Sequence, residues 1–208
     1  MPPELLDVLD ACPLTKVWKT RDRPAEPDLA GLRDRALLLV GFFAALRRGE
    51  LAALTIDQVT EHLNGLVIAL PRSNTNQHGV HAELVVLPRA GHPTRCPVTA
   101  LRAWLDAAQI NEGPVLRPVS KANRPLPRRL HPESVNTLIQ AAIARAGLDP
   151  VPYSAHSLRA GFVTYAHLRG ASDRAIAHQT RHRSLATVGT YVRIHEAWAD
   201  NAATQLGL

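Results

Sequence analysis

The chain has 208 residues, of which 46% are hydrophobic and 20% are charged, and its formal net charge is +6 with a pI near 10. This composition is that of a globular protein with a modest preference for a polyanionic partner. The longest apolar run, residues 36–46, is too short to span a membrane, and the first residues lack a signal-peptide pattern. The two cysteines, Cys12 and Cys96, are typical of a reduced protein without a disulfide framework, so we expect a cytoplasmic protein.

Hydrophobic periodicity and capping residues predict a mostly helical chain. Asp28 is a good N-cap for a central buried helix, and Ser172 is a good N-cap for a helix near the C-terminus. Helices are expected over residues 3–11, 28–43, 97–108, 131–143, 155–170, 173–179 and 185–205.

Two strands are predicted near the middle of the chain, over residues 65–70 and 82–87, joined by a polar turn at residues 71–79. Residues 13–27 indicate a loop, and Val115-Leu116 is a candidate for a further short strand. The expected fold is mainly α with a small antiparallel β-sheet. Residues 1–27 would form an N-terminal helix and linker, and residues 28–208 one compact domain.

The most informative stretch runs from His156-Ser157-Leu158-Arg159 to Arg181-His182-Arg183-Ser184 and Tyr191. His156 and Arg159 are three residues apart, so they share a face if the segment is helical. Tyr191 follows His182 by nine residues. A guanidinium group can bind two phosphate oxygens through two parallel hydrogen bonds, and a nearby tyrosine is a potential nucleophile. The stretch therefore points to chemistry on a phosphodiester.

Each of these residues also has an ordinary explanation when it is considered alone. A histidine on a half-apolar helix is usually structural, an arginine usually forms an ion pair, and a tyrosine usually belongs to the core. Arg47 and Glu50 would form a surface ion pair of little energetic value. His178 and His182 lack a third metal ligand in a recognisable pattern, and no Gly-x-Ser-x-Gly motif of a serine hydrolase is present.

Taken together, three boxes resemble the catalytic domain of the tyrosine recombinase (phage integrase) family. The boxes are Arg47-Arg48-Gly49-Glu50-Leu51, then His156-Ser157-Leu158-Arg159, then His182 with Tyr191 nine residues later. The resemblance covers roughly residues 28–193. It implies the fold of that catalytic domain and strand cleavage and rejoining in double-stranded DNA, with neither a metal nor another cofactor.

In the mechanism that the resemblance implies, Tyr191 attacks the scissile phosphate and forms a 3′-phosphotyrosyl intermediate. Arg47 and Arg159 would stabilise the charge on the non-bridging oxygens. His156 would act as a base or proton relay, and His182 would donate a hydrogen bond to the phosphate.

The same resemblance gives Glu50 a supporting role, orienting Arg47. It also reveals one departure, because the family commonly carries a lysine on the hairpin turn, as the acid that protonates the leaving 5′-oxygen. Asn74 occupies that position here, with Arg72 nearby as a second DNA-contacting residue, and no lysine lies between Lys19 and Lys121.

Two other functions stay open at this point. The chain could be a DNA-binding relative whose catalysis is impaired at Asn74, or an enzyme that relaxes DNA like a type IB topoisomerase. The family's N-terminal clamp domain is expected to be absent, because 46 residues precede Arg47. Recombination in the family uses a tetramer on DNA, while the unbound domain could be a monomer.

Overall fold

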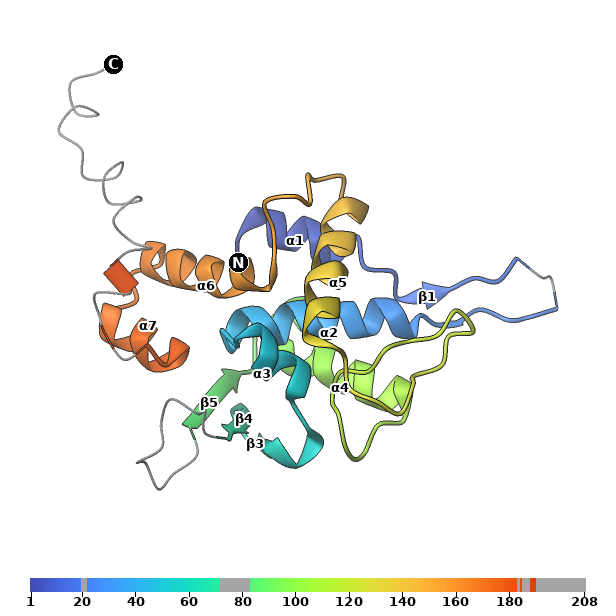
Figure 1. Ribbon diagram of the computed structural model, residues 1–208, viewed down its shortest axis with the longest axis horizontal. Coiled ribbons are helices and arrows are strands. Elements are labelled where there is room, and N and C mark those ends of the chain that lie inside the picture. The colour runs from blue at the N-terminus through green and yellow to red at the C-terminus, as the bar shows by residue number, and fades with distance from the viewer. Residues whose placement is uncertain (20–21, 72–82, 183, 185–187, 190–208) are drawn as a thin grey trace, which may run out of the picture.

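The computed structural model describes residues 1–19, 22–71, 83–182, 184 and 188–189 (Figure 1). Within these residues the chain is mainly helical. The α-helices are α1 (Pro3–Asp10), α2 (Leu29–Phe43), α3 (Arg48–Ala53), α4 (Pro97–Ala108), α5 (Pro132–Arg145), α6 (Ala155–Leu168) and α7 (Asp173–Thr180). The short 3-10 turns are η1 (Ile56–Gln58) and η2 (Pro93–Arg95).

Two small antiparallel sheets accompany the helices. Strands β3 (Val59–His62), β4 (Gly65–Leu70) and β5 (Glu83–Pro88) form one sheet in the order β3-β4-β5. Strands β1 (Thr15–Lys16) and β2 (Glu26–Pro27) pair as a separate hairpin that projects from the helical body in Figure 1. The fold class predicted from the sequence is therefore confirmed.

Helix α2 lies at the centre of the structure, and α4, α5 and α6 pack against it (Figure 1). Asp28 caps its N-terminus, as expected, by accepting a hydrogen bond from the Gly31 N–H (3.0 Å). The helix is buried nearly all round from Arg33 to Phe42. A helix with an apolar surface on all sides must lie inside the protein, and the continuous run of leucines in α2 explains its position.

Several local expectations need correction. Residues 13–27 are not wholly loop, because β1 and β2 pair there. Strand β3 was not predicted, since its mostly polar and exposed residues lack the alternation of a half-buried strand. Val115 and Leu116 are buried but form no strand in the described part of the chain, where the neighbouring Pro114 makes a single bridge to Thr55.

The expected turn of residues 71–79 and the final helix of residues 185–205 fall largely outside the described residues. No helix among the described residues is both long enough and apolar enough to cross a bilayer.

Candidate active site

A cavity of about 450 Å³ lies where α3, α5 and α6 approach the segment after α7. Four of the residues singled out in the sequence line it, namely Arg47, His156, Arg159 and His182. They come from three segments, and the first of these, at Arg47, lies more than a hundred positions before the other two. The fold therefore brings the dispersed boxes to one place.

The C-terminal end of α2 supplies backbone carbonyl groups that hold side chains at and beside the cavity. The helix ends at Phe43 with Ala44 as its C-cap, and the next residue, Ala45, has a left-handed backbone with φ of 46°. The last carbonyl groups of a helix lack partners within the helix and carry partial negative charge. Here they accept hydrogen bonds from side chains of α6 and α7, and Gln179 Nε2 donates to the Phe43 carbonyl (2.8 Å).

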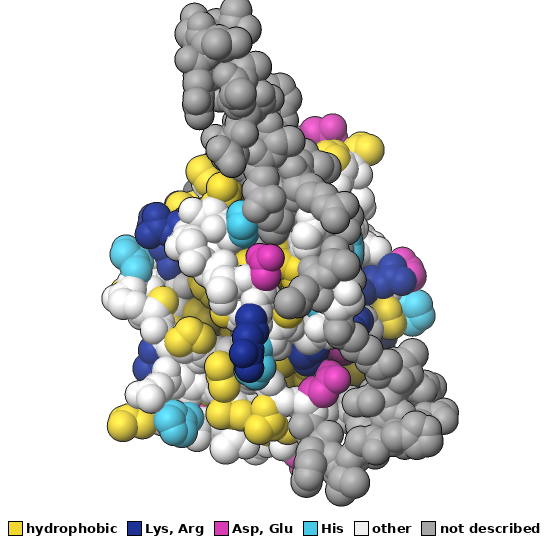
Figure 2. Space-filling view, turned by 90° about the vertical axis from the view of Figure 1, so that its left-hand side faces the viewer, with side chains coloured by type: hydrophobic (Ala, Val, Ile, Leu, Met, Phe, Trp, Pro, Cys, Tyr) yellow, Lys and Arg dark blue, Asp and Glu magenta, His cyan; other side chains and the backbone are white. Residues whose placement is uncertain are grey.

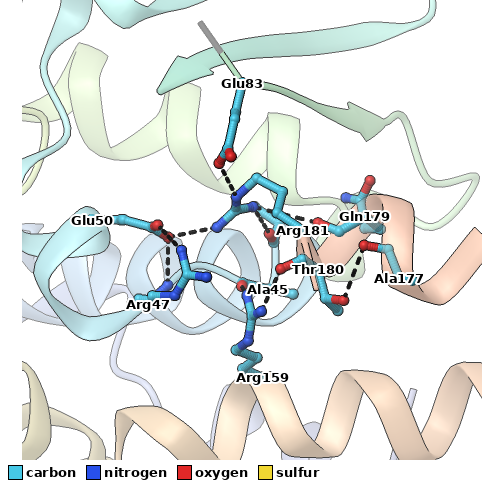
Figure 3. Close-up of polar contacts among 10 residues, drawn as sticks. Ala45, Arg47, Glu50, Glu83, Arg159, Ala177, Gln179, Thr180 and Arg181 are labelled. Carbon is cyan, nitrogen blue, oxygen red and sulfur yellow. Dashed lines mark hydrogen bonds and ion pairs between the residues drawn. The ribbon is translucent and has the colours of Figure 1, made fainter. Parts of the chain in front are cut away.

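Arg159 is held by two backbone carbonyl groups. Its side chain belongs to α6 and is buried, with 4% of the residue exposed. Nη1 donates to the Ala45 carbonyl (2.6 Å) and Nη2 donates to the Thr180 carbonyl. These two acceptors fix the plane of the guanidinium group in advance of any ligand, and they also link α2 to α7 (Figure 3).

Arg47 and Glu50 form the ion pair expected from their spacing. Arg47 Nη1 lies 2.7 Å from Glu50 Oε1, and the backbone N–H of Arg47 donates to Glu50 Oε2 (2.8 Å). The second contact places Glu50 at the N-terminus of α3, where a carboxylate interacts favourably with the helix dipole. Half of the Arg47 side chain remains exposed at the cavity.

Arg181 completes the arrangement and was not among the predicted site residues. Its Nη2 lies 2.6 Å from Glu50 Oε2, and its Nε lies 3.3 Å from Glu83 Oε2 at the start of β5, without the alignment of a hydrogen bond. Figure 3 shows Arg181 between these two carboxylates. Burial lowers the pKa of Arg181, while the charge of Glu50 opposes that shift.

The two cavity histidines differ in environment. His156 lies in the first turn of α6 and is exposed. His182 is partly buried, and burial lowers its pKa to about 4, with the positive charges of Arg159 and Arg47 acting in the same direction. His182 is therefore neutral at pH 7. Its position is set by the left-handed turn at Arg181 (φ 56°), after which the His182 N–H bonds the Ala177 carbonyl (3.0 Å).

Five of the predicted site residues, Arg47, Glu50, His156, Arg159 and His182, are thus found in or beside one cavity. Tyr191, Arg72 and Asn74 lie outside the described residues. Arg181 was missed although it directly precedes His182. The sequence alone does not distinguish Arg181, which would belong to the site, from neighbouring arginines on the surface.

The face that carries α6 and α7 is chemically mixed. Basic, acidic, histidine and hydrophobic side chains all appear on it (Figure 2). The positive charges that act on His182 at the cavity come from Arg159, Arg47 and Arg181.

The model of the phage integrase family matches residues 21–197. The chain belongs to this family. Among curated proteins, it is 36% identical over 181 residues to an integrase/recombinase xerD homolog from Selenomonas ruminantium, covering 87% of this chain and 53% of that protein. It is 30% identical over 181 residues to the tyrosine recombinase XerD of Xanthomonas axonopodis pv. citri, covering 82% and 54%.

Solved structures give the same fold. A XerH site-specific recombinase in a post-cleavage complex with a palindromic difH substrate matches with a TM-score of 0.67 at 19% identity, over 97% of this chain and 51% of that one. A XerA recombinase matches with a TM-score of 0.66 at 20% identity, over 100% and 63%. The chain spans about half the length of the curated relatives it matches. The family predicted from the three boxes is confirmed.

Proposed function

We propose that this chain is the catalytic domain of a site-specific DNA recombinase, which cleaves and rejoins DNA strands through a 3′-phosphotyrosyl intermediate. The observation that carries the proposal is the convergence of Arg47, His156, Arg159 and His182 on one cavity. Membership of the phage integrase family supports it. The matched relatives are named as recombinases, which favours strand exchange over topoisomerase-like relaxation.

The two arginines suit the stabilisation of a phosphorane. Arg159 donates hydrogen bonds to the carbonyl groups of Ala45 and Thr180, so its guanidinium plane is fixed before DNA binds. Fixed donors that face developing charge need no reorganisation during the reaction, and this is usually the largest contribution to catalysis. Arg47, restrained by Glu50 and half exposed, would grip the second non-bridging oxygen.

Tyr191 would supply the nucleophile, and His156 would accept or relay its proton. A tyrosine has an ordinary pKa of about 10, so its attack requires such a base or a strong positive field. The covalent link conserves the energy of the phosphodiester bond, and the displaced 5′-hydroxyl, or one from another strand, can reverse the step. The partner is double-stranded DNA, on which four copies would assemble.

The test is covalent trapping on DNA. A pool of nicked duplexes with a randomised central segment is incubated with the chain, so that cleavage beside the nick releases a short strand and prevents religation. Denaturing gels and sequencing then identify DNA bound to protein. We expect an adduct from the unaltered chain, none from Tyr191→Phe, and a yield at least about 100-fold lower from Arg159→Ala.

Absence of any Tyr191-dependent adduct, with salt-sensitive DNA binding retained, would instead identify a binding protein without chemistry. The Asn74→Lys variant separates the two cases. Restoration of an adduct by this lysine would show that the site is intact and lacks only the acid for the leaving group.

A further inference from the structure

Thr180, the last residue of α7, touches two side chains of the cavity. It is completely buried. Its carbonyl accepts a hydrogen bond from Arg159 Nη2, and its hydroxyl oxygen lies 2.8 Å from His182 Nδ1. One residue beneath the cavity therefore contacts both an arginine and a histidine of the site through different atoms.

The direction of the contact with His182 follows from the single proton of a hydroxyl group. Thr180 Oγ1 lies 2.7 Å from the Ile176 carbonyl oxygen. A carbonyl oxygen only accepts, so the hydroxyl proton must lie on that contact. Towards His182 the hydroxyl oxygen then presents a lone pair, and the hydrogen bond forms if the imidazole carries its proton on Nδ1.

We infer that Thr180 is a positioning residue that holds His182 in the Nδ1–H tautomer, so that Nε2 faces the cavity as a proton acceptor. Imidazole geometry places Nε2 on the far side of the ring from Thr180, and His182 lines the cavity. The inference adds a step to the proposed function, because His182 must gain a proton before it can donate a hydrogen bond to phosphate. It rests on that function for the identity of the anion in the cavity.

A neutral His182 in this tautomer has no proton to donate to a phosphate oxygen through Nε2. The contact requires a second proton, which solvent supplies to Nε2 to give the imidazolium form. Among the described residues, the charged and titratable groups around it include Arg159 and His156 on α6, Arg47 before α3, and Arg181 after α7, which is paired with Glu50 and Glu83. The negative charge of a bound phosphate offsets these positive charges and therefore favours protonation of His182 Nε2.

The tautomer can be measured directly in the chain without DNA. Two-bond ¹⁵N–¹H correlation spectra of the ¹⁵N-labelled chain at pH 7 distinguish a protonated Nδ1 from a protonated Nε2. We expect the His182 spectrum of the Nδ1–H form. A spectrum of the Nε2–H form would overturn the inference without reference to any variant, and neither result depends on whether the chain cleaves DNA.

Two substitutions test the role of the hydroxyl. Thr180→Val keeps the shape and the backbone carbonyl that binds Arg159 but removes the acceptor, so the Nε2–H form should become the larger population. Thr180→Ser should restore the Nδ1–H form. Thr137→Val is the matched control, because Thr137 makes the same type of bond to a carbonyl four residues earlier, on the exposed side of α5. An unchanged tautomer in a folded Thr180→Val protein would contradict the inference.

Discussion

Arg181 combines an unfavourable backbone conformation with a side chain that pairs with two carboxylates. Its φ of 56° lies in the left-handed region, which costs a residue other than glycine roughly 1 kcal/mol. Only 6% of its side chain is exposed, and it pairs with Glu50 and Glu83. The side chain therefore supplies a cation, which a glycine at this turn would lack, and this cation links Glu50 of α3 to Glu83 of β5.

The Arg181→Gly variant should fold, because glycine relieves the backbone cost, yet should cleave DNA about ten-fold more slowly. Without Arg181, the charge of Glu50 acts on Arg47 only, and Arg47 then binds phosphate more weakly. A ten-fold lower rate corresponds to a coupling of about 1.4 kcal/mol between Arg181 and Arg47. Single-turnover cleavage rates of the trapped substrate measure the effect, and thermal unfolding checks the fold.

Arg169→Gly is the matched control for this variant, since Arg169 is the exposed C-terminal cap of α6. It should leave the cleavage rate unchanged. If the two glycine variants cleave equally fast, Arg181 does not act on the site. The double variant with Glu50→Gln should be no slower than Glu50→Gln itself, because the two residues act through one contact.

Helices α2 and α5 are joined by a buried charge cluster that the sequence did not reveal. Asp34 is 2% exposed, and its Oδ1 accepts hydrogen bonds from Arg33 Nε (3.0 Å) and Nη2 (2.6 Å). Its Oδ2 accepts one from Arg145 Nη2 on α5 (2.8 Å). The charged residues at the start of α2 therefore belong to the packing between helices and not to a solvated helix end.

Replacing Asp34 with Asn should lower the free energy of unfolding by about 3–5 kcal/mol, because it leaves the buried guanidinium of Arg33 without a counter-ion. Urea titration followed by circular dichroism measures the loss. Glu61→Gln is the control, since Glu61 forms an exposed ion pair with Arg102, and its cost should stay below about 1 kcal/mol. Equal losses in the two variants would contradict the assigned role of Asp34.

Sequence reasoning located the elements that short-range signals define. Asp28 and Ser172 cap their helices as expected, and the boxes at Arg47, His156 and His182 meet in one cavity. It did not find contacts that depend on the whole arrangement. The left-handed turn at Ala45 could not be predicted, because alanine has no preference for that conformation.

The net charge and the localised arginines together predict how this chain binds DNA. For about four phosphate contacts, affinity for a duplex should fall about 100-fold between 50 and 200 mM salt. Fluorescence anisotropy at several salt concentrations measures the slope. Arg47→Ala should reduce that slope by about one, whereas Arg102→Ala should not change it, since Glu61 already neutralises Arg102. An unchanged slope in Arg47→Ala would place this side chain away from the phosphates.

Two backbone carbonyl groups at the end of α2 hold side chains at and beside the site, and this affects which substitutions the site can tolerate. Phe43 and Ala45 hold Gln179 and Arg159 through their carbonyl oxygens, which every amino acid possesses. No exchange of side chain at these two positions can delete the acceptors. Selection there acts on volume and, at Ala45, on tolerance of a positive φ. The carbonyl of Ala45, which orients the buried Arg159, therefore cannot be removed by a single substitution.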